Sequence, residues 1–319
     1  MQFNKVLITG AHGFAGANLC RALLTRGYDI RALVRNADRI PNLQAISGEI
    51  EVIGGDIRDR AVVDRAAKGA DLIFHLATAS SVVAARMDPV HAADVNIVGT
   101  INAATAAIRH NVNRFVHVST NHVYGNPPPQ LLPFNENSPC FPQDIYSVTR
   151  YAAERVLKPL IHDGLNVIIT RAFNHYGPFQ SKDSGLLIPA IVLPILQGRA
   201  PNLNNPNPTR DYSHVSDIVR GYIMAAESGK IGKTYIFASG VETSVGELAS
   251  MLIRLHQQEF GQSSRLRPIY REHRRHDLLR SCGDASCARR ELQWTPNMEL
   301  DEGLIHTLYW WREQLERVS

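Results

Sequence analysis

A phenol that can transfer a proton and a fixed cation stand four positions apart at the start of a helical pattern. They are Tyr146 and Arg150, in the stretch Y-S-V-T-R. Positions i and i+4 share one helix face, so the phenol and the guanidinium lie one above the other. A nearby positive charge favours the anionic form of a phenol. The spacing thus places a fixed cation beside a tyrosine, where its charge can favour tyrosinate.

A second group of polar side chains follows an apolar strand pattern at 114–119. The first three are Thr120, Asn121 and His122. An asparagine cannot transfer a proton, whereas a histidine titrates near neutral pH and can act as a base. An equally good interpretation of His122 is a strand-end ring packed against its neighbours. This segment is therefore poor in acids and holds one candidate base.

A third group has the spacing of a phosphate-binding turn. The stretch T-G-A-H-G-F-A-G at 9–16 follows an apolar run and precedes a helical pattern at 17–26. Gly10 permits the tight turn, Gly13 lets the backbone approach a pyrophosphate, and Gly16 lets the helix pack closely. Free N–H groups at the positive end of the helix then hold the pyrophosphate. The stretch predicts a dinucleotide-binding unit.

The elements that position these groups alternate along the first half of the chain. Helical patterns fill the gaps between apolar strand patterns at 6–8, 29–34, 50–53, 72–76, 114–119 and 167–169. This alternation predicts an α/β fold with a doubly wound parallel Rossmann sheet. After about residue 175 the strands shorten. We therefore expect a dinucleotide-binding domain at 1–175 and a smaller, discontinuous C-terminal substrate lobe at 176–319, with a return strand near 233–240.

The composition narrows the class of protein. The chain has 319 residues, 44% of them hydrophobic, and a net charge of +4 from 34 basic and 30 acidic residues. That charge balance gives no argument for nucleic acid as a partner. The four cysteines form no C-x-x-C pair, which indicates reduced thiols in a cytoplasmic protein and no metal site. No signal peptide or membrane span is expected, since the longest apolar stretch, 185–196, is short and holds two prolines.

The glycine spacing G-x-x-G-x-x-G, with Thr9 before it and Phe14 inside it, resembles the extended short-chain dehydrogenase/reductase superfamily. More narrowly, the chain resembles its NAD-dependent nucleotide-sugar epimerase/dehydratase family, of the UDP-glucose 4-epimerase-like type. In that family a Tyr-x-x-x-Lys pair exchanges a proton with a sugar hydroxyl while hydride moves to or from nicotinamide. Arg150 stands in place of the lysine and has a larger, planar head group. Two interpretations stay open: an enzyme of reduced rate, or a protein that binds ligand without turnover.

The resemblance also separates reaction types. It implies that the hydroxyl of Thr120 holds the reacting sugar oxygen. Sugar 4,6-dehydratases of the family place an Asp and a Glu at the next two positions, where this chain has Asn121 and His122. The sequence thus favours epimerisation through a 4-keto intermediate, or simple carbonyl reduction, over dehydration.

Other positions match cofactor-binding and substrate-binding residues of the family. The resemblance implies cofactor contacts from Gly10, His12, Gly13, Phe14, Gly16, Arg35, Asp56, Ile57, Leu76, Ala77, Thr78 and Asn96, together with Tyr146 and Arg150. It implies substrate contacts from Ser80, Asn121, Asn174, Arg210, Arg274 and Asp277. Arginine forks from separate loops suit a pyrophosphate.

The choice of cofactor stays open in the sequence. NAD-specific relatives carry an acidic residue at the end of the second strand, where this chain has Arg35. Arg35 can bind a 2′-phosphate and favour NADP, or lie on the adenine and leave NAD usable, as the resemblance favours. The resemblance implies a nucleotide-diphosphate sugar as partner. It also implies a homodimer through the helices at 89–110 and 146–160, which match the pair through which relatives dimerise. Three functions are open: a 4-epimerase, an NADPH-dependent reductase of a 4-keto sugar or other carbonyl, and a non-catalytic nucleotide-sugar or dinucleotide-binding protein.

Overall fold

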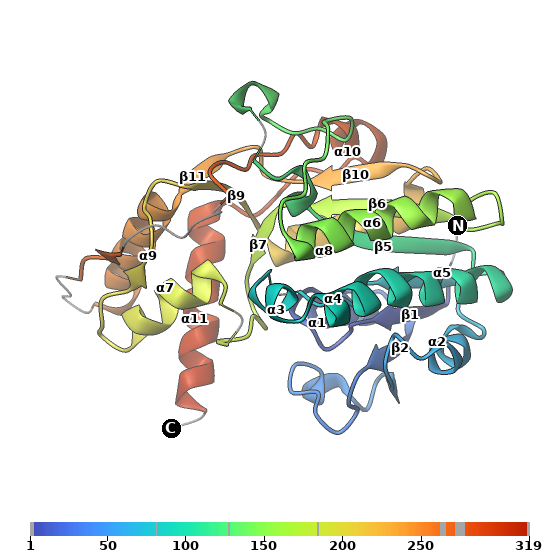
Figure 1. Cartoon of the computed structure of the whole chain (residues 1–319). Coiled ribbons are helices and arrows are strands. Elements are labelled where there is room, and N and C mark those ends of the chain that lie inside the picture. The colour runs from blue at the N-terminus through green and yellow to red at the C-terminus, as the bar shows by residue number, and fades with distance from the viewer. Residues whose placement is uncertain are drawn as a thin grey trace.

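A parallel sheet of seven strands forms the centre of the computed structural model, which describes residues 3–80, 82–126, 128–183, 185–261, 266–271 and 278–317. The strand order is β10-β6-β5-β4-β1-β2-β3. The strands are β1 (Lys5–Thr9), β2 (Asp29–Val34), β3 (Glu51–Gly54), β4 (Leu72–His75), β5 (Arg114–Thr120), β6 (Val167–Ala172) and β10 (Thr234–Phe237) (Figure 1). The predicted Rossmann sheet is confirmed, and its edge strand β10 pairs in parallel with β6.

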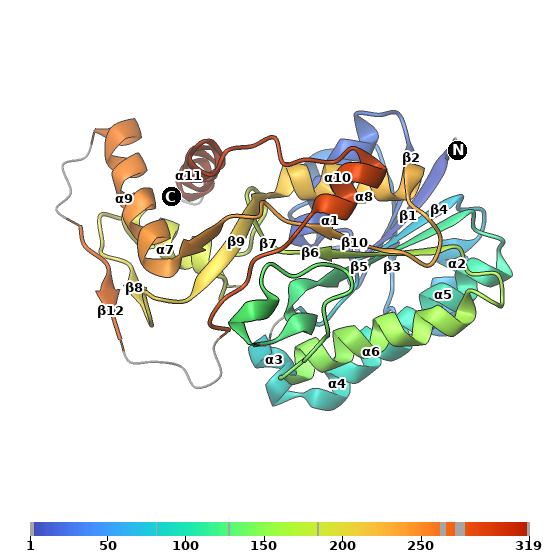
Figure 2. The ribbon, with the colours of Figure 1, turned by 90° about the horizontal axis from the view of Figure 1, so that it is seen from above.

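Helices cover both faces of this sheet, as Figure 2 shows from above. One layer holds α1 (Phe14–Leu24), α8 (Val215–Ser228) and α10 (Ser286–Leu292). The other layer holds α2 (Arg60–Ala67), α5 (Gly99–Arg109) and α6 (Ile145–Leu160), continued by α3 (Val82–Met87) and α4 (Pro89–Ala93). Two hydrophobic cores result, one on each face, so the central strands are buried on both sides.

The start of α6 is fixed by a capping box. The carboxylate of Asp144 accepts the N–H of Ser147 at 2.9 Å, and the hydroxyl of Ser147 accepts the N–H of Asp144 at 3.1 Å. This reciprocal pair satisfies N–H groups that a helix start otherwise leaves free. Tyr146 is therefore held in the first turn of the helix, as the sequence predicts.

The single helix predicted at 89–110 is interrupted. The chain forms α4, then a π-helical segment at Asp94–Val98, then α5. A π-bulge widens one turn and re-aims the side chains on it, and such bulges are frequent at functional sites. Here the widened turn contains Asn96, whose contacts are described below.

A second lobe lies at the carboxyl ends of the sheet strands (Figure 1). It has its own hydrophobic core between α7 (Leu187–Leu196), α9 (Val245–Phe260) and α11 (Leu300–Glu316). Its strands are β7 (Asn174–Tyr176), β9 (Thr209–His214) and β11 (Glu242–Ser244), with a short pair formed by β8 (Asn202–Leu203) and β12 (Ile269–Tyr270). Within 176–319, however, α8, β10 and α10 pack on the main sheet, so the chain passes between the two parts more than once.

The apolar stretch at 185–196 contributes α7, whose buried face belongs to the core of the second lobe. Among the described residues, no helix combines the length and the apolar character that crossing a membrane requires.

Candidate active site

The candidate site lies where the strand order reverses, between β1 and β4. Open α/β sheets bind ligands at this switch point, outside the carboxyl ends of the strands. Gly10 follows β1 with φ +69°, and a Cβ on it would lie 2.8 Å from the backbone N of Ala77, which follows β4. The turn therefore requires glycine at position 10, as the sequence predicts, and so does the close approach to the neighbouring strand.

The first turn of α1 leaves backbone donors available. A Cβ on Gly16 would lie 2.4 Å from the carbonyl oxygen of Gly10, so only glycine lets the helix start this close to the turn. Gly13 is the N-cap residue, and no side chain caps the helix. The N–H groups at the start of α1 can therefore bind an anion. A pyrophosphate contact at Gly13 and Phe14 stays a prediction.

A segment of the second lobe braces this turn. The ring of Phe14 stacks on that of His175 at 5.2 Å. The side-chain amide of Asn42 donates to the carbonyl oxygens of His12 at 3.1 Å and Phe179 at 3.2 Å. The turn is thus held between the two parts of the molecule.

Arg35 is exposed and follows β2 directly. Burial, and to a smaller extent the charge of Arg35, lowers the pKa of His12. The guanidinium therefore acts electrostatically on the glycine turn, where it can meet either an adenosine ribose or a 2′-phosphate.

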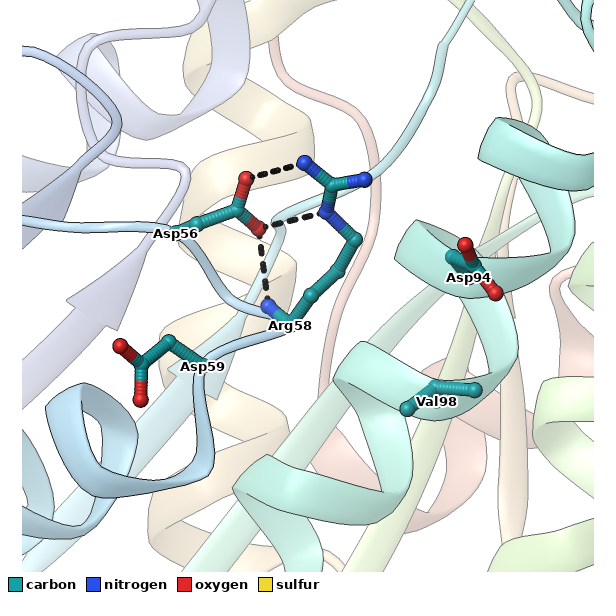
Figure 3. Close-up of a pocket in the computed structure, with 5 residues that line it drawn as sticks. All are labelled: Asp56, Arg58, Asp59, Asp94 and Val98. Atoms are coloured by element: carbon teal, nitrogen blue, oxygen red, sulfur yellow. Dashed lines mark hydrogen bonds and ion pairs between the residues drawn. The ribbon is translucent and has the colours of Figure 1, made fainter.

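An open cavity of about 520 Å³ lies beside the segment after β3 (Figure 3). Asp56, Arg58 and Asp59 line one side, and Asp94 and Val98 of the π-helical segment line the other. The carboxylate of Asp56 pairs with the guanidinium of Arg58 at 2.7 Å, which lowers the pKa of Asp56. Ile57, its neighbour in the predicted adenine contact, is buried in the hydrophobic core. Asp56 lines this cavity, and its adenine contact stays a prediction.

The loop after β4 is tied to the start of α6 through one buried amide. The Oδ1 of Asn96 accepts the hydroxyl of Thr78 and the N–H of Ala79, both at 2.9 Å. Its Nδ2 donates to the hydroxyl of Thr149 at 2.9 Å. Asn96 is 0% exposed, and its three hydrogen bonds make it a bridge between the loop and α6. Its predicted cofactor contact stays a prediction.

The other predicted site residues of that loop are Leu76, Ala77 and Ser80. The N–H groups of Leu76 and Ala77 donate to the backbone and side-chain oxygens of Thr9, both at 3.2 Å. These bonds hold the end of β4 against the end of β1. Ser80, a predicted substrate contact, is exposed.

Tyr146 faces His122 at the mouth of the site. Their ring centroids are 5.6 Å apart, with the rings at 81°. Burial lowers the pKa of His122 to about 4, opposed by the charge of Asp144 and assisted by that of Arg210. The imidazole is therefore neutral at pH 7, where it is a weak base. Thr120, the predicted anchor of the sugar oxygen, accepts the N–H of His122 at 3.3 Å.

Arg150 lies one turn deeper and is only 2% exposed. Its Nη2 donates to the backbone carbonyl of Val118, while Nε and Nη1 are buried without a hydrogen-bond partner. No carboxylate of the described residues forms an ion pair with it. A buried cation left this way is costly unless an anion or an acceptor joins it. The site is thus suited to an anionic group or to hydroxyl acceptors beside Arg150.

The predicted substrate residues fall into three groups. Asn121 is buried, and its Nδ2 donates to the hydroxyl of Ser281 at 2.8 Å. Asn174 keeps a buried Oδ1 without a partner, and Arg210 on β9 lies near enough to act on the pKa of His122. Arg274 and Asp277 lie outside the described residues.

A buried ion pair behind the site was not predicted. The Nε and Nη2 of Arg171 donate to the two carboxylate oxygens of Glu154 at 3.0 and 2.6 Å. Ser119, which precedes Thr120, donates its hydroxyl to the same carboxylate. The available signal in the sequence is Arg171, a charged residue just after the apolar strand pattern at 167–169. The pair fixes β6 against α6, and the Ser119 hydroxyl ties the end of β5 to the same carboxylate.

Taken with the glycine turn, the Tyr146–Arg150 pair and the switch point define a dinucleotide-binding α/β protein of the extended short-chain dehydrogenase/reductase type. Residues 7–307 match the family model described as GDP-mannose 4,6 dehydratase, and the chain belongs to this family. The resemblance seen in the sequence is therefore confirmed.

Relatives in this family carry two activities. The chain is 32% identical to a UDP-glucose 4-epimerase of Mycolicibacterium smegmatis, over 97% of this chain and 99% of the relative. It is 31% identical to a dTDP-glucose 4,6-dehydratase of Streptomyces griseus, over 97% and 94%. The crystal structure of a dTDP-glucose 4,6-dehydratase from Streptomyces venezuelae with NAD and TYD bound superposes with a TM-score of 0.88, at 29% identity and 98% coverage of both chains. The family thus includes both epimerases and dehydratases.

Proposed function

We propose that this protein is an NAD-dependent nucleotide-sugar 4-epimerase that acts through a 4-keto intermediate. The observation that carries the proposal is the acid-poor end of β5. Dehydratases of the family are expected to have an acid and a base after the threonine, whereas Asn121 is held by Ser281 and His122 is neutral at pH 7. Neither residue suits the elimination of water, which needs both a proton donor and a base.

The residues have separate tasks in this proposal. Tyr146 removes the proton from the C4 hydroxyl and later returns one, and Thr120 holds the C4 oxygen. The charge of Arg150 stabilises the anionic phenol, because no carboxylate of the described residues pairs with it. When bound, NAD would accept a hydride from C4 and give it back to the opposite face of the keto sugar. The NAD complex of the Streptomyces venezuelae relative supports this choice of cofactor.

A reductase is the second candidate, and exposed Arg35 is the observation that favours it. A guanidinium at the end of β2 can pair with a 2′-phosphate, which distinguishes NADP from NAD. A reductase must exchange its cofactor at each turnover, whereas an epimerase keeps it.

The first experiment identifies any dinucleotide released when freshly purified protein is denatured. Stoichiometric NAD supports the epimerase, and an empty protein that binds added NADPH supports the reductase. The second experiment incubates the protein with UDP-glucose or dTDP-glucose and follows the sugar by NMR and mass spectrometry. Conversion to the C4 epimer supports the proposal, whereas a product that has lost water overturns it. Binding of the nucleotide sugar by wild-type protein without any turnover supports the non-catalytic alternative.

Tyr146→Phe tests the role of the phenol directly. The variant is expected to lose turnover while its thermal midpoint stays that of the wild type, because the ring contact with His122 survives. Tyr309→Phe, which loses only an exposed hydrogen bond to Glu259, is the matched control and is expected to keep full activity. An active Tyr146→Phe variant contradicts the scheme.

We further propose a homodimer through the helices of the α6 layer. Large apolar side chains are exposed there, with Met87 82% exposed on α3, Val90 71% on α4 and Val148 45% on α6. A second copy of the chain would remove this apolar surface from water. Sedimentation of Met87→Glu/Val90→Glu is expected to show a monomer. The control Val241→Glu, at a 63% exposed position of the other lobe, is expected to stay dimeric.

A further inference from the structure

Arg150 presents donors that the described residues leave without acceptors. Its Nη2 donates to the carbonyl of Val118, but Nε and Nη1 are buried and unpartnered. A buried donor without an acceptor forfeits the hydrogen bond that water gave it in the unfolded chain. One or more groups around the guanidinium must therefore accept hydrogen bonds from it in the working protein.

His117 lies in β5, directly before the Val118 whose carbonyl oxygen this guanidinium binds. Side chains alternate along a strand, so His117 and Ser119 share one face of the sheet. Ser119 donates to Glu154 of α6, so this is the face that α6 covers. The guanidinium of Arg150 reaches the same strand from α6, because its Nη2 binds the carbonyl oxygen of Val118, the residue after His117.

The ring of His117 is fully buried, and neither of its nitrogens has a hydrogen-bond partner. It stacks on His75 at 5.6 Å. Both nitrogens of His75 are occupied, by Thr9 at 2.8 Å and Thr100 at 3.0 Å, so His75 cannot serve Arg150. Of these two histidines, only His117 has free capacity.

Burial, followed by the charges of Arg150 and His75, lowers the pKa of His117 well below its ordinary value. The ring is therefore neutral, with one nitrogen protonated and one lone pair free to accept. A carboxylate in the same place would accept the hydrogen bond but would also neutralise the cation. A neutral imidazole accepts the bond and leaves the positive charge acting on Tyr146.

We propose that His117 is a positioning residue that accepts a hydrogen bond from the Arg150 guanidinium and thereby lets an arginine work where relatives are expected to have a lysine. The inference rests on the proposed function, since it assigns a purpose to the charge of Arg150. It concerns only residues of this chain.

The direct test needs no turnover. In protein labelled with ¹⁵N-histidine, the His117 resonances are identified by their absence from His117→Phe. At pH 7 we expect a neutral ring whose unprotonated nitrogen shifts on Arg150→Met and does not shift on Lys158→Met, an exposed cation of the same helix. A resonance that is indifferent to Arg150→Met overturns the proposal.

A double-mutant cycle tests the consequence for function. His117→Phe is expected to weaken NAD binding and turnover about tenfold, the usual weight of a hydrogen bond to a charged group. In the Arg150→Lys background the same change is expected to stay within about twofold, because the lysine does not need this acceptor. His117→Gln, whose amide oxygen accepts, is expected to recover most of the loss. Equal losses in both backgrounds, at unchanged thermal midpoints, would show a purely structural role and overturn the proposal.

The two tests separate this proposal from the function on which it rests. A wild-type protein without turnover on any nucleotide sugar would defeat the epimerase, while the histidine resonances would still decide whether His117 binds Arg150.

Discussion

Asn121 and Ser281 are joined by a hydrogen bond of 2.8 Å between side chains that lie 160 residues apart in the chain. Asn121 follows β5 at the candidate active site, and Ser281 belongs to the segment that returns from the second lobe to α10. Gly283 of the same segment donates its N–H to Asp211 at 3.2 Å. The returning segment therefore fixes the end of β5 from the side of the second lobe, at the position where relatives that eliminate water are expected to carry an acid.

Asn121→Ala and Ser281→Ala should each destabilise the protein by about 1–2 kcal/mol, since each leaves one buried partner unsatisfied. The double variant should cost clearly less than the sum of the two, because the second change removes a group that is already unpaired. Unfolding in urea measures all three. Strict additivity would show that the two side chains do not interact in solution.

Glu154→Gln should cost about 3–5 kcal/mol of unfolding free energy, because Arg171 keeps a buried charge without its carboxylate. The side chains of this pair are 2% and 6% exposed. Asp301→Asn is the matched control, since its pair with Arg254 lies at the surface with 49% and 56% exposure. The control should change stability by less than about 1 kcal/mol. Equal effects of the two substitutions in urea unfolding would contradict the role assigned to burial.

The features that the sequence predicts correctly depend on local patterns. Strands buried on both faces give short apolar runs. In the glycine turn, the positive φ of Gly10 and the contact of Gly16 with the Gly10 carbonyl both act within seven residues. The helix that carries Tyr146 is likewise set by its own capping box. Such features depend little on the rest of the fold.

The features that the sequence does not reveal depend on contacts between distant segments. The π-helical turn around Asn96 accompanies bonds to Ala79 and Thr149, so the helical period at 89–110 gives no sign of it. In the sequence, nothing distinguishes His117 from the other residues of its strand pattern. Its position near Arg150 depends on the packing of α6 on β5. The second lobe is interleaved with the sheet because α8 and α10 pack on it, which composition alone does not show.

Gly16→Ala should weaken NAD binding and destabilise the protein by about 1–3 kcal/mol, the usual cost of forcing an extra group into a packed site. The new Cβ would meet the carbonyl oxygen of Gly10 at 2.4 Å. Gly48→Ala is the control, because nothing lies within 4 Å of its added Cβ. Titration with NAD and thermal unfolding should show the control close to the wild type. An unaffected Gly16→Ala variant would mean that α1 does not pack on the turn as described.

The stability of the protein should fall as the pH drops below about 6.5, in part because of His75. Burial and the charge of Arg150 lower the pKa of this histidine to about 3. Above the ordinary value of 6.5 the ring is neutral in both the folded and the unfolded chain, and its contribution is complete. Between 6.5 and 3 only the unfolded chain takes up the proton, which costs about 1.4 kcal/mol per pH unit.

Urea unfolding of wild type and His75→Gln at pH 7, 6 and 5 measures this contribution. The variant should show the shallower dependence of unfolding free energy on pH, whatever its stability at pH 7. His214, whose pKa burial lowers to about 4, acts with the same sign and keeps a slope in the variant. Parallel curves for the two proteins would contradict a neutral, buried His75.

Arg150→Lys and Arg150→Met separate charge from geometry in the candidate active site. Methionine fills a similar volume without charge, so the phenol of Tyr146 loses its electrostatic support, and turnover should fall about a hundredfold or more. Lysine keeps the charge on a shorter, flexible stem, so turnover should stay within about tenfold of the wild type. Michaelis kinetics on the nucleotide sugar that the wild-type protein converts measures both variants. A lysine variant as poor as the methionine variant would show that the contact of the guanidinium with the Val118 carbonyl matters more than its charge.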